Sequence, residues 1–247
     1  MRAPWRFLVS DAKRAEPETI HHDEQFLIVH KPPGLPTTAP NAEDPSLVRW
    51  VDERFSDLRP HATSRLDSPV SGLVTFALTR EANRHLLDAR SAGTYERVYL
   101  GITLHEVPVD EGEWTWPISI DPTNPKLRVA GAGRGEREAS TRYEVAARTA
   151  SATLLRFMPD TGRTHQLRVH ASRANAPLFG DHVYQGHRRK VLADGTVVTA
   201  RRVMLHCARV SFPSPSVGGS MQFDAPARSD MQNVWLALGG APSDLQP

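Results

Sequence analysis

Short apolar runs that stop at turns containing proline or glycine recur along this chain. Residues 26–30 form one such run, and it ends at residues 31–34, where two prolines remove backbone donors and impose a turn. Residues 72–78 are almost continuously apolar, which is typical of a strand buried on both faces. Residues 95–104 are rich in β-branched and aromatic residues and predict the next strand. These runs predict a sheet at the centre of the fold.

Helical patterns separate the predicted strands. Ser46 can cap a helix whose apolar residues are spaced by three and four, and Thr79 can cap a second helix over residues 80–92. Two further helices are expected over residues 163–174 and 230–238. The other predicted strands cover residues 142–148, 153–158, 204–212 and 221–223, with short β candidates within residues 105–140. This mixed order predicts an α+β fold with a central mixed, largely antiparallel sheet flanked by helices.

The domain organisation follows from length and pattern. The chain has 247 residues, which is enough to bury a core without cross-links. Residues 1–20 are charged and show no hydrophobic period, so they predict an N-terminal tail. No repeat, low-complexity block or linker divides the remainder, and residues 21–240 are expected to form a single domain.

Cysteine content and hydropathy exclude several classes of protein. One cysteine cannot form an internal disulfide or supply a zinc-finger set, which indicates the reducing cytoplasm. No apolar run approaches the roughly 18 residues that a membrane helix needs. Cys207 lies in an apolar run, which favours a buried, inert thiol over a nucleophile. We therefore expect a cytoplasmic monomer that holds no metal and does not associate with membranes.

The formal net charge of +2, from 30 Lys and Arg against 28 Asp and Glu, hides an asymmetry. Residues 121–210 hold 16 basic and 7 acidic residues, whereas residues 1–120 hold 13 basic and 18 acidic residues. A basic segment in a nearly neutral chain suggests a surface for a polyanion such as nucleic acid. An ordinary solvated basic face is the alternative.

Catalytic motifs of several other classes are absent from the sequence. His165 and His170 have neither the i, i+4 spacing nor the Glu of a metalloprotease helix. No G-x-S-x-G elbow and no G-x-x-x-x-G-K-[ST] phosphate loop occurs. The glycine-rich residues 131–135 neither follow a predicted strand nor open a helix, which excludes a dinucleotide loop there.

Two polar stretches are more specific than packing requires. Residues 64–72 place Asp67 in a loop that leads into the most apolar strand, although a lone Asp there is also a common turn residue. Residues 160–170 place Arg163 and Arg168 five positions apart, so they share no helix face unless the helix begins between them. A basic, solvated helix start is the alternative for this stretch. Together the stretches indicate one carboxylate working beside an arginine.

Several stretches resemble RluA-type RNA pseudouridine synthases and occur in the order found in that family. They are residues 26–36, Arg65-Leu66-Asp67 with Ser71-Gly72-Leu73, residues 162–170, Gly180-Asp181 with Tyr184, and Leu205-His206. The resemblance covers roughly residues 20–226. It implies that the chain has the pseudouridine synthase catalytic fold. It also implies that the protein isomerises uridine in ribosomal or transfer RNA to pseudouridine, without metal or organic cofactor. Members often carry a small basic RNA-binding domain in front, which the expected 20-residue tail could not hold.

The resemblance also implies roles for individual residues. Asp67 matches the essential aspartate, Arg168 the arginine that pairs with it, and Tyr99 the tyrosine packed against the target base. Arg65 resembles the arginine that helps to hold the duplex open. Further RNA contacts are expected from polar residues of the shared motifs and from the basic stretch over residues 186–202, namely Lys31, Arg163, His165, Gln166, Arg188, Arg189 and Lys190. An ordinary charged hairpin is the alternative for the basic stretch.

The chemistry of the reaction suits these residues. The N1–C1′ bond must break, the uracil turn over and C5 bond to C1′, so a carboxylate at the sugar can act as nucleophile or base. A bidentate pair with Arg168 would keep Asp67 ionised in a pocket that excludes water. The target base must leave its stack, which costs about a few kcal/mol and is partly offset by stacking on Tyr99.

Four positions differ from the family pattern around the aspartate. Ser64 stands where the family usually has His, Val70 stands where it has Thr, and Ser68-Pro69 replaces a charged pair. We expect these differences to affect loop geometry and substrate choice more than catalysis, because the predicted catalytic residues remain. The alternative hypothesis is a non-catalytic RNA-binding protein on the same scaffold.

Overall fold

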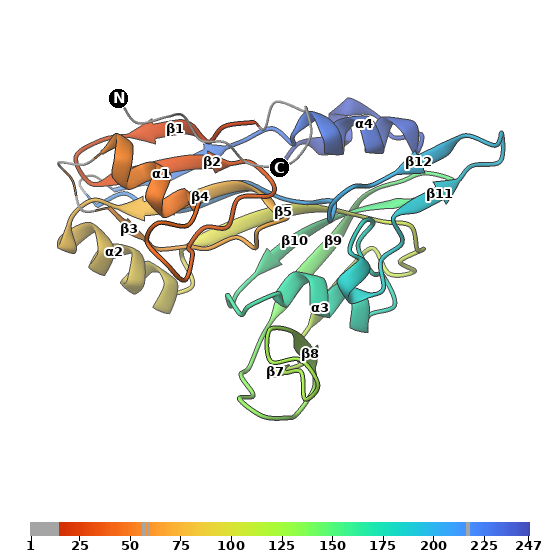
Figure 1. Cartoon of the computed structure of the whole chain (residues 1–247), viewed down its shortest axis with the longest axis horizontal. Helices are drawn as coiled ribbons and strands as arrows, with labels where there is room; N and C mark the ends of the chain where they lie inside the picture. Colours follow the sequence, from red (N-terminus) through yellow and green to blue (C-terminus); the bar gives the residue numbers. More distant parts are fainter. Residues whose placement is uncertain (1–14, 56–57, 59, 216–217) are drawn as a thin grey trace.

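The computed structural model describes residues 15–55, 58, 60–215 and 218–247, and a sheet of ten strands forms its centre (Figure 1). The strands of this sheet are β1 (Glu18–His22), β2 (Phe26–Lys31), β3 (His61–Ala62), β4 (Ser71–Ala77), β5 (Glu96–Thr103), β6 (Glu111–Trp114), β9 (Thr141–Arg148), β10 (Thr153–Pro159), β13 (Leu205–Pro213) and β14 (Ser220–Asp224).

The order of the strands makes the sheet mixed and largely antiparallel. Its main path is β1-β2-β4-β13-β5-β10-β9-β6, while β3 pairs with β4 and β14 pairs with β13. The pair β4 and β13 is parallel, and the other pairs of this sheet are antiparallel. The predicted α+β fold is therefore confirmed.

Two of the four described α-helices begin where the sequence supplies a capping side chain. The described helices are α1 (Leu47–Arg54), α2 (Arg80–Ser91), α3 (Gln166–Arg173) and α4 (Ser229–Ala237), with short 3-10 turns η1 (His182–Tyr184) and η2 (Pro242–Leu245). Ser46 Oγ accepts the N–H of Arg49 at 3.2 Å, and Thr79 Oγ1 accepts the N–H of Ala82 at 3.0 Å, as predicted. Among the described residues, none of these helices is long and apolar enough to cross a bilayer.

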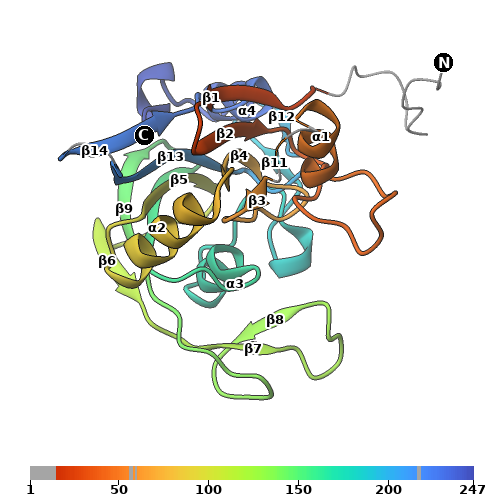
Figure 2. The same ribbon diagram turned by 90° about the vertical axis from the view of Figure 1, so that its left-hand side faces the viewer.

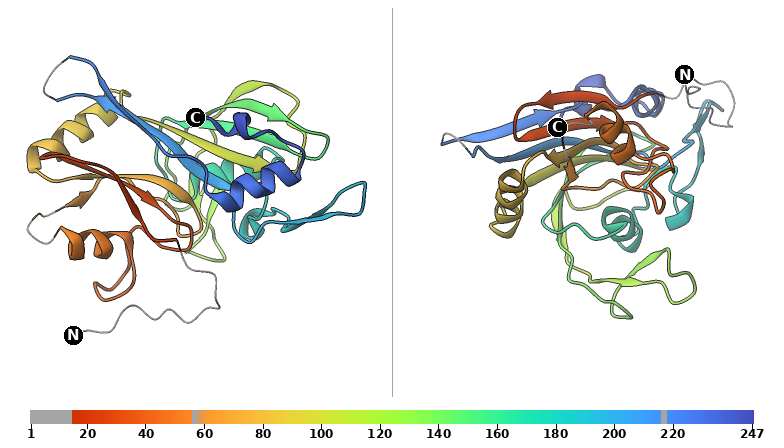
Figure 3. Two further views of the ribbon diagram at one scale, coloured as in Figure 1. Left: turned by 90° about the horizontal axis from the view of Figure 1, so that it is seen from above. Right: turned by 60° about the vertical axis from the view of Figure 1, so that its left-hand side comes forward.

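Two hairpins lie outside the large sheet. The first pairs β7 (Ile118–Ile120) with β8 (Arg128–Ala130) and lies beyond α3 from the sheet in Figure 2. The second pairs β11 (Arg189–Val191) with β12 (Val197–Thr199), within the basic stretch recognised in the sequence. This β11–β12 hairpin projects from the body of the molecule in Figures 1 and 3.

Most buried side chains belong to two main clusters, which lie on opposite sides of the sheet at β5. Tyr99 and Leu100 are neighbours on β5 but belong to different clusters, as the alternating faces of a strand require. The cluster of Tyr99 includes Leu86 of α2 and Leu167 of α3. The cluster of Leu100 includes Trp235 of α4, the dark blue helix that lies across the sheet in Figure 3. Helices therefore cover both faces of the sheet.

The structure differs from two predicted boundaries. Residues 18–20, expected in the tail, already belong to β1, because they lie at the start of its pairing with β2. The rest of the predicted tail includes residues 1–14, which lie outside the described residues. The helix expected from residue 163 begins only at Gln166, because His165 has a left-handed φ of 59° that no helical turn contains.

The parallel pair of strands fixes one end of the loop that carries Asp67. Gly72 lies opposite Cys207 of β13 and has a φ of +121°. A Cβ at Gly72 would lie 2.3 Å from the carbonyl oxygen of Cys207, which is closer than any side chain allows. Glycine is therefore required at this position, and it seats the start of β4 directly against β13.

Fully buried His206 on β13 makes the fold sensitive to acid. Its Nε2–H donates to the Ala225 carbonyl at 3.1 Å and its Nδ1 accepts from the Ser71 hydroxyl at 2.9 Å, so the neutral ring is satisfied. Burial lowers the pKa of His206 to about 4. In the unfolded protein the histidine pKa is about 6.5. The stability that neutral His206 contributes is therefore fully present above pH 6.5 and is lost as the pH falls toward 4.

We therefore expect His206 to reduce the free energy of unfolding by roughly 2–3 kcal/mol between about pH 7.5 and pH 4.5. Urea unfolding of the wild type and of His206→Asn at both pH values measures this difference. The variant should lose that part of the pH dependence, whereas His61→Asn, at an exposed position on β3, should keep it. Equal pH dependence in His206→Asn and the wild type would contradict the assignment.

Candidate active site

A cleft of about 480 Å³ opens where the loop before β4, strand β5 and the start of α3 meet. The residues predicted from the sequence that line it are Arg65, Asp67, Tyr99, Arg163, His165, Gln166 and Arg168. Predicted residues outside its lining are Lys31 and, on or beside the β11–β12 hairpin, Arg188, Arg189 and Lys190. Predicted residues from three stretches far apart in the sequence thus meet in one cleft.

Hydrogen bonds to its backbone hold the Asp67 loop on both sides of the aspartate. Thr37 Oγ1 accepts the N–H of Leu66 at 2.9 Å and donates to the carbonyl of the same residue at 3.0 Å. On the other side, the Ser68 carbonyl accepts the N–H of Gly34 at 2.7 Å. The segment after β2 therefore fixes the residue before Asp67 and the residue after it.

The positions that differ from the family pattern make contacts of their own. Ser64 Oγ accepts the N–H of Thr75 on β4 at 3.0 Å. Val70 is 3% exposed and belongs to the apolar core. The residues that replace the family pattern thus also hold the loop in place, and Asp67 still lies in the cleft.

Arg168 of α3 joins two carboxylates. Its Nη1 donates to Oδ2 of Asp67 at 3.0 Å, so the pair expected from the sequence is present. Its Nε and Nη2 donate to both carboxylate oxygens of Asp181, at 2.7 and 2.8 Å. The bidentate contact expected with Asp67 is therefore made with Asp181 instead. The Asp67 side chain is 23% exposed, whereas that of Asp181 is 2% exposed.

The burial of Asp181 explains this geometry. A carboxylate that deep in the protein needs a cation with matching hydrogen bonds, which a guanidinium edge supplies. Burial of Arg168 works against its charge, but Asp181 and then Asp67 outweigh that effect and raise the pKa of Arg168 above its usual value. The guanidinium is thus held by Asp181 and presents its remaining nitrogen to Asp67.

His165 and Tyr184 complete the polar surroundings of Asp67. His165 Nε2 lies 3.8 Å from Asp67 Oδ2, and His165 Nδ1 lies 2.6 Å from the Tyr184 hydroxyl. The same hydroxyl oxygen accepts the N–H of Arg128 at 3.1 Å. The Arg168 guanidinium lies 4.9 Å from the centre of the Tyr184 ring. Burial lowers the pKa of His165, and the opposing charge of Asp67 does not outweigh it.

Tyr99 lines the cleft from β5 with 7% of its surface exposed. Burial raises the pKa of its hydroxyl well above the usual value, so the ring stays neutral. Cys207, its partner on β13, is fully buried, and burial raises the pKa of the thiol to about 12. The buried position predicted for the Cys207 thiol is confirmed.

Lys31 is buried, which contradicts its predicted contact with RNA. Its side chain is fully enclosed, and Nζ donates to the carbonyls of Pro32, Leu35 and Ser68 at 3.0, 2.7 and 3.3 Å. Burial, followed by the nearby positive charge of Arg202, lowers the pKa of Lys31 to about 7. The lysine instead ties the turn after β2 to the Asp67 loop.

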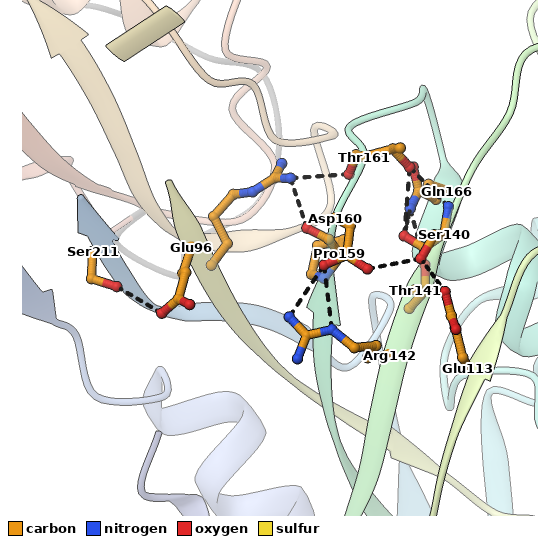
Figure 4. A network of polar contacts seen from close by, with 11 residues as sticks. Glu96, Glu113, Ser140, Thr141, Arg142, Pro159, Asp160, Thr161, Gln166 and Ser211 are labelled. Atoms are coloured by element: carbon orange, nitrogen blue, oxygen red, sulfur yellow. Dashed lines mark hydrogen bonds and ion pairs between the residues drawn. The ribbon is translucent and has the colours of Figure 1, made fainter. Parts of the chain in front are cut away.

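Gln166 is likewise used inside the protein (Figure 4). Its Oε1 accepts from the Arg163 N–H at 2.9 Å and from the Thr161 hydroxyl at 2.8 Å. Its Nε2 donates to the Ser140 carbonyl at 2.8 Å and to Thr141 Oγ1 at 3.0 Å. Both ends of the amide are occupied, so the predicted RNA contact of Gln166 is wrong. The side chain fastens the turn before α3 to β9.

The cleft carries more positive than negative charge. Four arginines line it without a carboxylate partner among the described residues: Arg65, Arg90, Arg97 and Arg163. Asp67 is the carboxylate in the lining, and it is already paired with Arg168. This balance favours a polyanionic ligand, because positive groups in a concave surface reinforce one another's field.

Sequence reasoning assigned no role to several of these residues. Asp181 and Tyr184 belong to a recognised motif, so the signal was present, but their contacts depend on how η1 packs on α3. Arg90 and Arg97 come from the part of the chain with an acidic excess, where a charge count by segment gives no signal.

Comparisons with known proteins find similarity to one family of enzymes. A family model described as RNA pseudouridylate synthase matches residues 25–173. The ribosomal large subunit pseudouridine synthase D of Neisseria meningitidis is 29% identical over 235 residues, which cover 90% of this chain and 61% of the relative. The dual-specificity RNA pseudouridine synthase RluA of Pasteurella multocida is 31% identical over 213 residues, which cover 85% of this chain and 92% of the relative. The chain thus spans less than two thirds of the first relative's length.

Two solved structures share the fold. Human RNA pseudouridylate synthase domain containing 4 has a TM-score of 0.70 at 20% identity, over 90% of this chain and 92% of that one. Human RNA pseudouridylate synthase domain containing 1 has a TM-score of 0.68 at 19% identity, over 92% and 91%. The catalytic fold implied by the sequence resemblance is therefore confirmed.

Proposed function

Because the chain belongs to the RNA pseudouridylate synthase family and is of the RluA type, we propose that it isomerises specific uridines in RNA to pseudouridine. The observation that carries this proposal is the setting of Asp67. Its carboxylate is 23% exposed in the cleft, and a buried arginine holds it at 3.0 Å. A carboxylate that substrate can reach, yet that is fixed in direction, suits chemistry at a sugar carbon.

The proposed reaction breaks one bond and forms another. The glycosidic N1–C1′ bond breaks, the uracil turns over, and C5 bonds to C1′; C5 then loses its hydrogen as a proton and N1 gains one. Asp67 acts on the sugar as nucleophile or base, and both roles need its ionised form. Arg168 supports that form by donating a charge-assisted hydrogen bond.

The target base must be extruded from its stack to reach this cleft. Tyr99 offers an aromatic ring in the lining, against which the uracil packs. Arg65 is exposed at the cleft, where it can occupy the space that the extruded nucleotide leaves. These roles follow from the family resemblance and are supported by the positions of both residues.

The names of the relatives support a proposal for the substrate class. The names of those relatives specify the large ribosomal subunit for one and dual specificity for the other. We extend this to the present chain as action on ribosomal or transfer RNA, in the cytoplasm, as a monomer and without metal or cofactor.

Release of tritium from RNA labelled at uridine C5 tests the proposal, because only substitution at C5 frees that hydrogen. Total RNA from cells that lack the gene supplies a substrate whose target uridine is unmodified. We expect one equivalent of tritium per target site, undiminished by EDTA once the RNA has been folded. RNA binding without tritium release would instead support the alternative, a non-catalytic RNA-binding protein.

Thr37 provides a test of how the Asp67 loop is held. Thr37→Val keeps the shape of the side chain but removes both hydrogen bonds to Leu66, so we expect the single-turnover rate to fall by about 10–100-fold through misplacement of the carboxylate. Thr37→Ser keeps the hydroxyl and should recover most of the rate. Equal rates for the Val and Ser variants, at equal melting temperatures, would contradict a positioning role.

The β11–β12 hairpin provides a second test, for its predicted grip on phosphates. RNA affinity should fall with salt by about 0.7–0.9 log units per log unit of salt for each phosphate neutralised. Replacing Arg188, Arg189 and Lys190 together by Glu should flatten that slope. An unchanged slope would mean that the stretch is an ordinary charged hairpin.

A further inference from the structure

Arg90 and Arg97 both place their guanidinium groups near one aromatic ring at the cleft. The guanidinium of Arg90, in the last turn of α2, lies 4.5 Å from the centre of the Tyr95 ring, and that of Arg97 on β5 lies 6.0 Å from it. Both arginines line the cleft. Neither belongs to the contacts that hold Asp67.

The ring that supports them is itself fixed. Tyr95 is 6% exposed, its hydroxyl is bonded to Thr75 Oγ1 at 2.9 Å, and it stacks on Phe212 at 5.9 Å with 10° between the ring planes. The two guanidinium groups therefore rest on a rigid surface. Little side-chain freedom remains to be lost when a ligand binds there.

Several hydrogen-bond donors of the pair have no partner within the described residues, and two of them, Arg90 Nη2 and Arg97 Nε, are buried. Arg90 makes no side-chain hydrogen bond and no ion pair within the described residues. Arg97 donates from Nη2 to the carbonyls of Pro159 and Thr161, both at 3.0 Å, which fixes its direction without neutralising its charge. Two held cations without a carboxylate partner are arranged for an anion that comes from outside the protein.

We propose that Arg90 and Arg97 together bind one phosphate of the RNA backbone beside the target nucleotide. The proposal rests on the proposed function and adds a second part to its site: the Asp67 end receives the nucleoside, and the Arg90–Arg97 end holds the strand. A phosphodiester suits the pair, because planar guanidinium groups match its oxygens and an RNA strand supplies such a group beside every base.

The slope of affinity against salt measures this contact. For unmodified substrate RNA, Arg90→Gln and Arg97→Gln should each lower the slope of log affinity against log salt by about 0.7–0.9, which corresponds to one phosphate. Because both arginines share that phosphate, the double variant should lose no more slope than either single variant. Arg84→Gln is the matched control, since Arg84 is exposed on the same helix and does not line the cleft.

A purely structural role for Arg90 would give a different result. Its position at the end of α2 and its contact with Tyr95 also stabilise the fold, so Arg90→Gln would then lower the melting temperature and leave the slope unchanged. That outcome would overturn the proposal, as would a double variant that loses the slope of two phosphates. Absence of tritium release by the wild-type protein would refute the proposed isomerisation alone, because the salt slopes are measured by binding.

Discussion

Asp67→Asn is expected to abolish pseudouridine formation while the protein still folds and binds RNA. The amide oxygen of Asn can accept the same hydrogen bond from Arg168 Nη1, so the local geometry is retained. An amide is neither nucleophile nor base, however, and the step at the sugar is lost. We expect a fall of roughly 10⁴-fold or more in the single-turnover rate.

Tritium release with saturating RNA measures this rate, and a binding assay checks that affinity is retained. Asp88→Asn, on the exposed face of α2, is the matched carboxylate control and should behave as the wild type. Appreciable turnover by purified Asp67→Asn would remove Asp67 from the reaction and refute the assignment of the site.

Asp181→Asn is expected to cause the second large effect, although Asp181 is enclosed and cannot touch RNA. It binds two of the three guanidinium nitrogens of Arg168 and so sets the direction of the third toward Asp67. Without its charge the guanidinium can turn, and we expect the single-turnover rate at saturating RNA to fall by about 100-fold. The dissociation constant for RNA should change little, because the loss concerns orientation of the reacting group.

Arg168→Lys tests the contact between Arg168 and Asp181 by changing the arginine instead of the carboxylate. A lysine keeps the charge but cannot make a two-point contact with Asp181 and also reach Asp67, so both rate and stability should fall, stability by up to about 3–5 kcal/mol. Arg163→Lys is the comparison, since Arg163 lies in the turn before α3 and should mainly affect binding. Near wild-type chemistry in Arg168→Lys, together with its loss in Arg163→Lys, would show that the pair was assigned to the wrong arginine.

Local patterns of the sequence predicted the elements of the fold well. Strands and caps depend on neighbours in the chain, so Ser46 and Thr79 could be recognised directly. The turn at His165 could not be, because its left-handed backbone accompanies a contact with Tyr184, which comes later in the chain and is brought close only by the fold. The start of β1 was missed because a charged edge strand carries a weak hydrophobic signal.

The candidate site was predicted where family motifs mark it and missed where only packing defines it. Asp67 and Arg168 carry a motif, but the choice of Asp181 as the two-point partner depends on which carboxylate is more deeply buried. Lys31 lies in a family motif as well, and because lysine is a basic residue we predicted that it contacts RNA. Enclosure by three carbonyl oxygens cannot be read from a lysine in a sequence, so its contact was predicted wrongly.

The parallel pairing of β4 with β13 also has a consequence for how the molecule assembles. Gly72 and Cys207 meet across a sequence separation that spans more than half of the chain. Pairings of such high contact order form late, because the chain must close a long loop before the contact stabilises it. The β1–β2–β4 meander can form early during synthesis, but the aspartate loop is not seated until β13 has been made. The nascent chain thus acquires catalytic competence only after β13 has been synthesised and paired with β4.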